Sequence, residues 1–291
     1  MARFQRVTTL RIAVPNKGSL SLPSEQLLAA AGYRVHRANR ELMIDDTRND
    51  VRFFFLRPRD IALYVGTGTL DAGITGRDLL IDADTGAEES LALGYSESTF
   101  RFASRPDELT TVADLAGRRV ATSYPGLVGQ YLARHGVEAK LVRLDGAVET
   151  SVQLGIADAV ADVVETGTSL RNSGLAVFGE PILRSEAVLI RRPDLTPEVS
   201  AGIDRVQRRL EGVLIARNYV MIDFDCPTAI LDQACALVPG VESPTVSPLA
   251  REGWMAVRSL VPRDRAAIVM DELWEVGARA ILVSALESSR I

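Results

Sequence analysis

Short apolar runs with strand character alternate with helix-like segments along most of this chain, and the runs end in polar turns. Leu10–Val14 is followed by Pro-Asn-Lys-Gly, Val51–Leu56 by Arg-Pro-Arg-Asp, and Leu70–Thr75 by Gly-Arg-Asp. This alternation predicts an α/β fold with a mainly parallel sheet, whose ligands bind beyond the carboxyl ends of the strands. Each polar turn is therefore a place to look for binding residues.

Composition limits the classes of function. The chain has 291 residues, 47% hydrophobic and 24% charged, which is typical of a soluble globular protein of two or three domains. A net charge of −5 gives no broad basic surface for nucleic acid. The N-terminus lacks the apolar core of a signal peptide, and no run is long enough to cross a membrane. We therefore expect a cytoplasmic protein with no nucleic-acid or membrane partner. Two cysteines suggest reduced thiols, and two histidines exclude a histidine-rich metal site.

The most specific chemistry follows the apolar run Ala159–Val164. The chain continues as Glu-Thr-Gly-Thr-Ser, where backbone N–H groups and hydroxyls converge and Gly167 allows close approach of an anion. The carboxylates of Asp162 and Glu165 suit the hydroxyls of a sugar. The segment predicts a site for a 5-phosphorylated ribose, with an ordinary turn after a strand as the plain alternative.

This segment resembles the phosphoribosyl-diphosphate loop of phosphoribosyltransferases, D-x-V-x-T-G-x-T. The common loop has two adjacent acids, and here Ala161 replaces the first of them. That departure fits one branch, ATP phosphoribosyltransferase. The matching positions are Asp162, Val164, Thr166 and Gly167, with Ser169 near the end of the loop.

Further segments resemble the long form of ATP phosphoribosyltransferase along nearly the whole chain. They occur in the family's order: A-V-P-N-K-G-S-L, F-F-F-L-R-P-R-D-I, G-I-T-G-R-D, residues 143–169, D-F-D-C-P and E-S-P-T-V-S-P-L. The resemblance implies an enzyme that joins ATP to phosphoribosyl diphosphate with Mg²⁺. It also implies a homo-oligomer, a hexamer built from dimers, that is inhibited by histidine and by AMP.

The expected architecture has two parts. A two-lobed catalytic part, similar to periplasmic binding proteins, would comprise lobe I at 1–98 with a returning segment at 186–214, and lobe II at 99–185. The block 215–291 shows a βαββαβ order, which predicts a ferredoxin-like regulatory domain. The two-lobed assignment rests on analogy.

The proposed reaction displaces diphosphate at ribose C1 by adenine N1. Positioning and charge stabilisation should dominate this chemistry, and Mg²⁺ should bind mainly to substrate phosphates, with no metal site made by the protein alone. The resemblance implies three catalytic residues, Lys17, Arg57 and Asp162. It implies the following substrate-binding residues: Asn16, Arg40, Gly76, Arg77, Glu149, Glu165, Thr166, Gly167, Thr168 and Ser169. The linear pattern does not assign the basic residues to ATP or to diphosphate.

Several of these residues also have a structural interpretation. Lys17 could be a solvated turn lysine, and Arg57 could pair with Asp60 at a helix start. Arg40 fits an ordinary surface position. Glu149 could simply favour the dipole of a helix at its first turn.

Four residues of the C-terminal block align with positions at which the long-form family holds histidine: Asp225, Val241, Thr245 and Ala280. Asp225 could meet the ammonium group of the ligand, and Thr245 could offer its hydroxyl. Alternatively, Asp225 could cap a helix predicted over Pro227–Leu237, with Pro227 in the first turn.

Three other functions remain open on sequence alone. A solute-binding protein would share the two-lobed fold but would normally be exported. A prephenate-dehydratase-like enzyme would not need the phosphate loop. A catalytically silent amino-acid sensor of the same fold would be expected to lose Lys17 and Asp162, and both are present.

Overall fold

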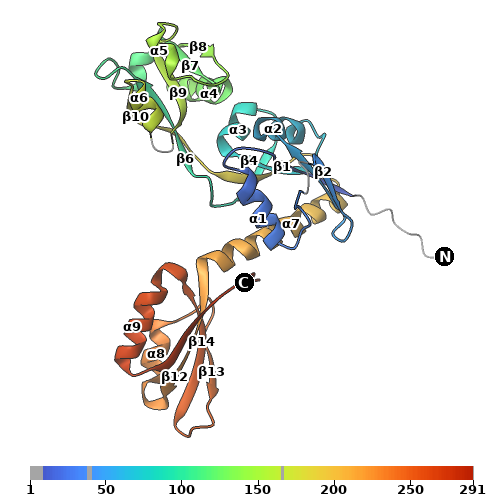
Figure 1. Ribbon diagram of the computed structural model, residues 1–291, viewed down its shortest axis with the longest axis vertical. Coiled ribbons are helices and arrows are strands. Elements are labelled where there is room, and N and C mark those ends of the chain that lie inside the picture. The colour runs from blue at the N-terminus through green and yellow to red at the C-terminus, as the bar shows by residue number, and fades with distance from the viewer. Residues whose placement is uncertain (1–8, 38–40, 165–166, 291) are drawn as a thin grey trace, which may run out of the picture. The chain divides into compact units, whose positions relative to one another are not determined.

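The computed structural model describes residues 9–37, 41–164 and 167–290 (Figure 1). The chain divides into two compact units. The first contains residues 1–26 and 34–207, and the second contains residues 27–33 and 208–291. Within the described residues, no helix is long and apolar enough to cross a bilayer.

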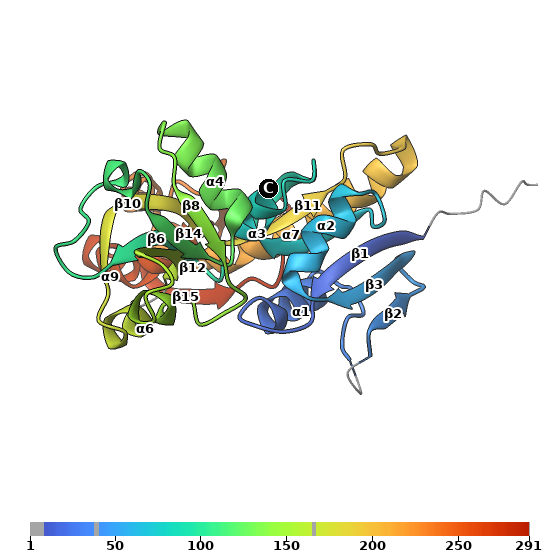
Figure 2. The ribbon, with the colours of Figure 1, turned by 90° about the horizontal axis from the view of Figure 1, so that it is seen from above.

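The first unit begins with a six-stranded sheet, which we call the first lobe together with its helices. Its strand order is β2-β3-β1-β4-β11-β5, and Figure 2 shows β1, β3 and β2 side by side. Strands β1, β3 and β4 are parallel, whereas β2 is antiparallel to β3, and β11 is antiparallel to both of its neighbours, β4 and β5. The prediction of a mainly parallel sheet is therefore correct in this sheet only for β1, β3 and β4. The strands are β1 (Leu10–Pro15), β2 (Met43–Asp46), β3 (Val51–Leu56), β4 (Ala72–Gly76), β5 (Glu88–Ala92) and β11 (Ala187–Arg191).

Apolar side chains explain why this sheet forms. Side chains along β3 alternate between buried and half-buried, so that Phe53 and Phe55 face the interior while their neighbours face the other side. Ile61 and Val65 pack against Val188 on the same sheet. The helices of this region are α1 (Ser21–Ala30), α2 (Pro58–Gly66) and α3 (Arg77–Ala83).

A five-stranded sheet, the second lobe with its helices, completes the first unit. Its strand order is β10-β6-β9-β7-β8. Alternate residues of β9 face different cores: Ala161 packs with Leu127 of α4, and Val160 packs with Leu170 of α6. Figure 2 accordingly shows α4 and α6 on opposite faces of this sheet. The elements are β6 (Ser98–Ser104), η1 (Val112–Leu115), β7 (Arg119–Thr122), α4 (Pro125–Arg134), β8 (Lys140–Arg143), α5 (Thr150–Gln153), β9 (Ala159–Val164), α6 (Thr168–Asn172) and β10 (Ala176–Ser185).

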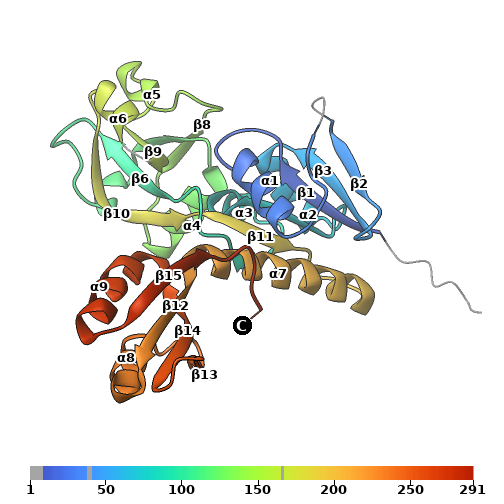
Figure 3. The same cartoon turned by 60° about the horizontal axis from the view of Figure 1, so that its bottom comes forward.

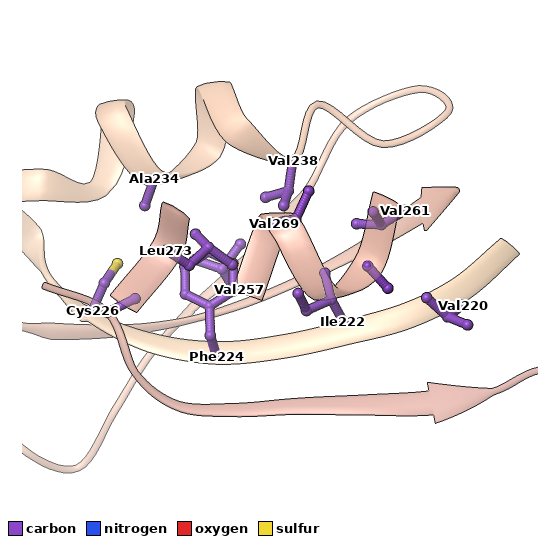
Figure 4. Packing of buried hydrophobic residues seen from close by; sticks show 12 residues of the cluster. Val220, Ile222, Phe224, Cys226, Ala234, Val238, Val257, Val261, Val269 and Leu273 are labelled. Carbon is purple, nitrogen blue, oxygen red and sulfur yellow. The ribbon is translucent and has the colours of Figure 1, made fainter. Parts of the chain in front are cut away.

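The second unit has the βαββαβ order expected from the sequence. Its antiparallel strand order is β13-β14-β12-β15, and Figures 1 and 3 show α8 and α9 on one face of the sheet. The core between them contains Phe224, Val257 and Leu273 (Figure 4). The elements are α7 (Pro197–Asn218), which enters from the first unit, β12 (Tyr219–Pro227), η2 (Thr228–Ile230), α8 (Leu231–Leu237), β13 (Thr245–Pro248), β14 (Trp254–Pro262), η3 (Arg263–Arg265), α9 (Ala266–Val276) and β15 (Arg279–Ala285).

Two local predictions were wrong. The helix predicted over Pro227–Leu237 begins as a 3₁₀ turn, and its α-helical part starts only at Leu231. Asp225 lies within β12 and does not cap this helix, because Pro227 is the N-cap residue of the 3₁₀ turn and makes no side-chain cap. Strand pairing with β14 extends through Pro227 and overrides the local capping pattern.

Candidate functional site

The carboxyl ends of three adjacent strands in the first lobe carry most of the predicted basic residues. Asn16 and Lys17 follow β1, Arg57 follows β3, and Arg77 follows β4. The backbone N–H of Asn16 donates to the carbonyl of Leu56 at 2.8 Å, which joins the first two of these strand ends. The fold therefore brings the predicted turns together at one edge of the sheet.

The side chains at this edge differ in their surroundings. Lys17 and Arg57 are exposed. Arg57 makes no ion pair with Asp60 among the described residues, although its carbonyl accepts the Asp60 N–H at 2.9 Å. In the described part of the chain the Oδ1 atom of Asn16 is buried and has no hydrogen-bond partner. A buried acceptor without a partner is uncommon and is satisfied when a ligand supplies a donor.

Asp162 lies on β9 of the second lobe and is half-buried. Its Oδ1 accepts the N–H of Val163 at 2.8 Å. Burial raises the pKa of Asp162 to about 6, and repulsion from Glu149 and Asp78 adds to the increase. The carboxylate is therefore costly to ionise in the free protein and gains from a ligand that donates hydrogen bonds to it.

The phosphate loop continues from β9 into α6. Gly167 has φ +69°, a left-handed conformation that a side chain would strain. The Ser169 hydroxyl donates to Oε1 of Glu149 at 2.7 Å, and Arg171 donates to the Thr168 hydroxyl at 3.2 Å. Arg171 was not predicted from the sequence, although its position four residues after Gly167 could have indicated it. The predicted residues Arg40, Glu165 and Thr166 lie outside the described residues.

Arg77 is engaged by two carboxylates. Its guanidinium donates to Glu89 at 2.7 Å and to Glu186 at 3.1 Å, and these partners raise its pKa. Together with Ser185 and Val164 it lines a cavity of about 400 Å³ where β6 and β10 leave the second lobe. A phosphate reaching Arg77 would have to share this side chain with two acids.

Two residues that interact electrostatically with Asp162 were not among the sequence candidates. Asp78 is 7% exposed and accepts the Ser185 hydroxyl at 2.8 Å. Tyr124 is half-buried, and burial, followed by the charges of Asp78 and Asp162, raises the pKa of its phenol. Gly76, predicted to bind substrate, is buried, and a Cβ there would lie 2.3 Å from Oδ1 of Asp78. Its role in the structure is to let this carboxylate pack closely.

Metal-binding groups are sparse among the described residues, where no cluster of three His, Cys, Asp or Glu side chains could hold an ion. The carboxylates of Glu149 and Asp78 are close enough to Asp162 to raise its pKa. They are hard oxygen donors of the kind that Mg²⁺ accepts.

Replacing Glu149 by glutamine is expected to lower the pKa of Asp162, because it removes a repelling negative charge. If ionised Asp162 is required, the acidic limb of the kcat/KM profile should lie near pH 6 in the parent enzyme and at lower pH in Glu149→Gln. Rate measurements between pH 5 and 9 check this. An unchanged acidic limb in the variant would show that another group controls it.

A separate pocket of about 350 Å³ lies in the second unit. Three of the four predicted histidine-binding residues line it: Asp225, Thr245 and Ala280. Val241 instead lines a different, mostly apolar pocket of about 480 Å³. The structure thus brings three of the four residues together.

The backbone at the first of these pockets is irregular. Ala280 has φ +50°, in the left-handed region, and it lies in a β-bulge where two residues of β15 oppose Phe224 of β12. A left-handed alanine costs about 1 kcal/mol or more and such strain gathers at binding sites. Arg258, on the pocket wall, pairs with Asp223 at 2.6 Å.

Comparison with known families assigns both units. The family model described as "ATP phosphoribosyltransferase" matches residues 57–212, and the model "HisG, C-terminal domain" matches residues 216–288. ATP phosphoribosyltransferases of Streptomyces coelicolor and of an Arthrobacter species are each 58% identical to the chain, over 97% of its length and 100% of theirs. These matches favour the transferase over the solute-binding, dehydratase and sensor alternatives.

A solved structure has a similar fold over part of this chain. It is an ATP phosphoribosyl transferase (HisG:HisZ) complex from Thermotoga maritima, 23% identical with a TM-score of 0.59. The alignment covers 69% of this chain and 98% of that chain. This similarity supports the two-lobed α/β architecture.

Proposed function

This chain belongs to the ATP phosphoribosyltransferase family, in the long form with its own C-terminal domain, and we propose how its residues carry out and regulate the reaction. The activity is the transfer of a phosphoribosyl group to ATP, the first step of histidine biosynthesis. The site residues, the metal ion and the regulation described below are our proposals. We also propose that the enzyme works in the cytoplasm, where its substrates are made.

The second lobe would hold the phosphoribosyl group. Thr168, Ser169 and the backbone at Gly167 surround the 5′-phosphate, with Arg171 as a nearby cation. Asp162 accepts the ribose hydroxyls. Glu149 positions the loop through its 2.7 Å hydrogen bond with Ser169. The observation that carries the assignment is that Glu149, whose charge raises the pKa of Asp162, also accepts the Ser169 hydroxyl of the loop.

The first lobe would hold the diphosphate or the phosphates of ATP. Lys17 and Arg57 are exposed cations at neighbouring strand ends, and Asn16 presents a buried acceptor beside them. An amino or hydroxyl group of a substrate could satisfy that acceptor. The basic side chains stabilise the departing diphosphate while adenine N1 attacks C1, so the protein acts through charge and position.

A divalent cation, Mg²⁺, would accompany the diphosphate and neutralise its charge as it leaves. Mg²⁺ prefers substrate phosphates with one or two protein carboxylates, and Asp162 and Glu149 supply hard oxygen atoms on the second lobe.

Histidine would inhibit through the pocket of the second unit. Asp225 suits the ammonium group, Thr245 offers a hydroxyl, and the bulge at Ala280 interrupts regular strand pairing. Inhibition at a distance requires two global states that differ in histidine affinity. We further propose a homo-oligomer, a hexamer built from dimers, with AMP as a second inhibitor.

An assay of phosphoribosyl-ATP formation with pyrophosphatase present tests these proposals together. We expect the rate to require Mg²⁺ and to fall when histidine is added. Full activity after chelation of divalent ions would reject the metal proposal, and a rate unaffected by saturating histidine would reject the effector pocket.

A further inference from the structure

Arg59 of the first lobe reaches the second lobe. It lies in the first turn of α2, two residues after Arg57, and its Nη1 pairs with Asp82 at 2.5 Å. Its Nη2 donates to the carbonyl of Ser123 in the second lobe at 2.8 Å, and its guanidinium lies 4.8 Å from the ring centroid of Tyr124. One side chain thus contacts both lobes.

Asp82 makes the reciprocal connection. It belongs to α3 of the first lobe, and its side chain is 6% exposed. Its Oδ1 accepts the N–H groups of Gly126 at 2.9 Å and Leu127 at 3.2 Å, in the first turn of the ten-residue helix α4. A carboxylate from one lobe therefore caps a helix of the other, where the helix dipole also favours a negative charge.

The two lobes approach each other to backbone contact at this point. A Cβ on Gly126 would lie 2.4 Å from the carbonyl oxygen of Asp82. No side chain fits there without moving α3 and α4 apart. Glycine at this position is therefore required by the close approach of the lobes, and the junction has little room to slide.

The junction borders the reacting centre. The Tyr124 ring lies edge-on to Phe100 at 5.0 Å, on the strand that pairs with β9. The same tyrosine is influenced by the charges of Asp78 on the first lobe and Asp162 on the second. Arg59 therefore contacts a ring that is close enough to Asp162, the proposed ribose-binding residue, to be influenced by its charge.

We propose that Arg59 and Asp82 are positioning residues, which fix the spacing between Asp162 with its phosphate loop on the second lobe and Lys17 with Arg57 on the first. The inference rests on the proposed placement of phosphoribosyl diphosphate across both lobes. A substrate whose two ends are held by different lobes reacts only when the lobes keep one spacing, and an error of about 1 Å can reduce the rate about 100-fold. Both residues act through others, because their polar atoms are used at the junction.

The test uses full-length Arg59→Met and Asp82→Asn variants and the double variant. Each single change is expected to raise KM for phosphoribosyl diphosphate and lower kcat, reducing kcat/KM about 10- to 100-fold. The kcat/KM of the double variant should be no lower than that of the more impaired single variant, because both residues act in one junction. Arg59→Lys should recover only part of the loss, since an ammonium group lacks the fork that reaches two acceptors.

A matched control is Arg119→Met, which breaks an ion pair with Asp158 contained within the second lobe. Its arginine is 43% exposed, against 41% for Arg59. This variant should lower the melting temperature while KM and kcat stay within about twofold of the parent values, which is the behaviour of a purely structural pair.

The inference is overturned if the Arg59 and Asp82 variants fold and keep KM and kcat within about twofold, or if their losses simply multiply in the double variant. Should Asp82→Asn not fold, Arg59→Met and Arg59→Lys decide alone. An active Asp162→Asn enzyme would instead reject the proposed substrate site, so the two failures can be told apart.

Discussion

Asp162→Asn is expected to reduce kcat/KM for phosphoribosyl diphosphate by about 100- to 1,000-fold and, at the same time, to raise the melting temperature. The carboxylate would accept hydrogen bonds from ribose hydroxyls, and bonds to a charged group contribute about 1.5–3 kcal/mol each. Asparagine keeps the acceptor for the Val163 N–H but loses the charge. Activity and stability should therefore change in opposite directions.

The gain in stability follows from the pKa of Asp162. Its pKa is about 6 in the folded protein, against an ordinary 3.8, so the folded state binds the proton more tightly than the unfolded state. The stabilisation by that proton is full below the ordinary value and is lost as pH rises through 6. At pH 8 the ionised carboxylate therefore costs at most about 3 kcal/mol, which asparagine avoids.

Calorimetry or thermal fluorescence at pH 5 and pH 8 checks this prediction. The melting temperature of Asp162→Asn should exceed that of the parent by a larger margin at pH 8. Asp158→Asn is the matched control, because Arg119 lowers the pKa of Asp158 to about 2 and that carboxylate stabilises the fold. It should lower the melting temperature and leave kcat/KM nearly unchanged. Parent-like activity in Asp162→Asn would reject the site.

Asp225→Asn is expected to weaken inhibition by histidine about 10- to 100-fold without changing catalysis in its absence. The ammonium group of histidine would lose a charge-assisted partner in the pocket that also contains Thr245 and Ala280. The proposed catalytic residues lie in the other unit, so the uninhibited rate has no direct reason to change.

Histidine titrations of the reaction rate, together with calorimetric binding, measure this effect. Asp232→Asn, a substitution of an exposed acid on α8, should keep the parent response. Val241→Ala tests the fourth predicted residue, which lines a different pocket in this chain. If Asp225→Asn binds and responds to histidine like the parent, the pocket is not the effector site.

Local patterns in the sequence were sufficient to predict much of the fold. Strand-forming runs such as Val51–Leu56 and Ala159–Val164 appear where expected, because short runs rich in β-branched and aromatic residues suit the partly buried surface of a sheet. Strands β2, β5 and β10 were not predicted from the sequence. β2 is four residues long, β5 is half-exposed, and β10 has a register shift between Phe178 and Leu183. These strands exist because of the neighbours with which they pair.

At the helix expected over Pro227–Leu237, a local pattern indicated a helix start that long-range pairing replaced with strand. Its Asp-Cys-Pro start resembles a capping sequence, yet β14 pairs with β12 through all three residues. Pairing with a strand about 30 positions away overrode the local preference, which sequence reasoning alone could not weigh.

By itself, the sequence determined the family and the order of most elements, because these depend on residue types at short spacing. The chemistry of the phosphate loop stays a prediction. Only the tertiary structure showed that the charges of Asp78 and Asp162 both act on Tyr124, that two acids engage Arg77, and that Val241 lies apart from Asp225. It alone joined Arg59 to Asp82, 23 positions away, and Asp82 to Gly126 of α4, a further 44 positions along the sequence. Such contacts depend on how the two lobes pack against each other, and no short-range pattern of residues encodes that geometry.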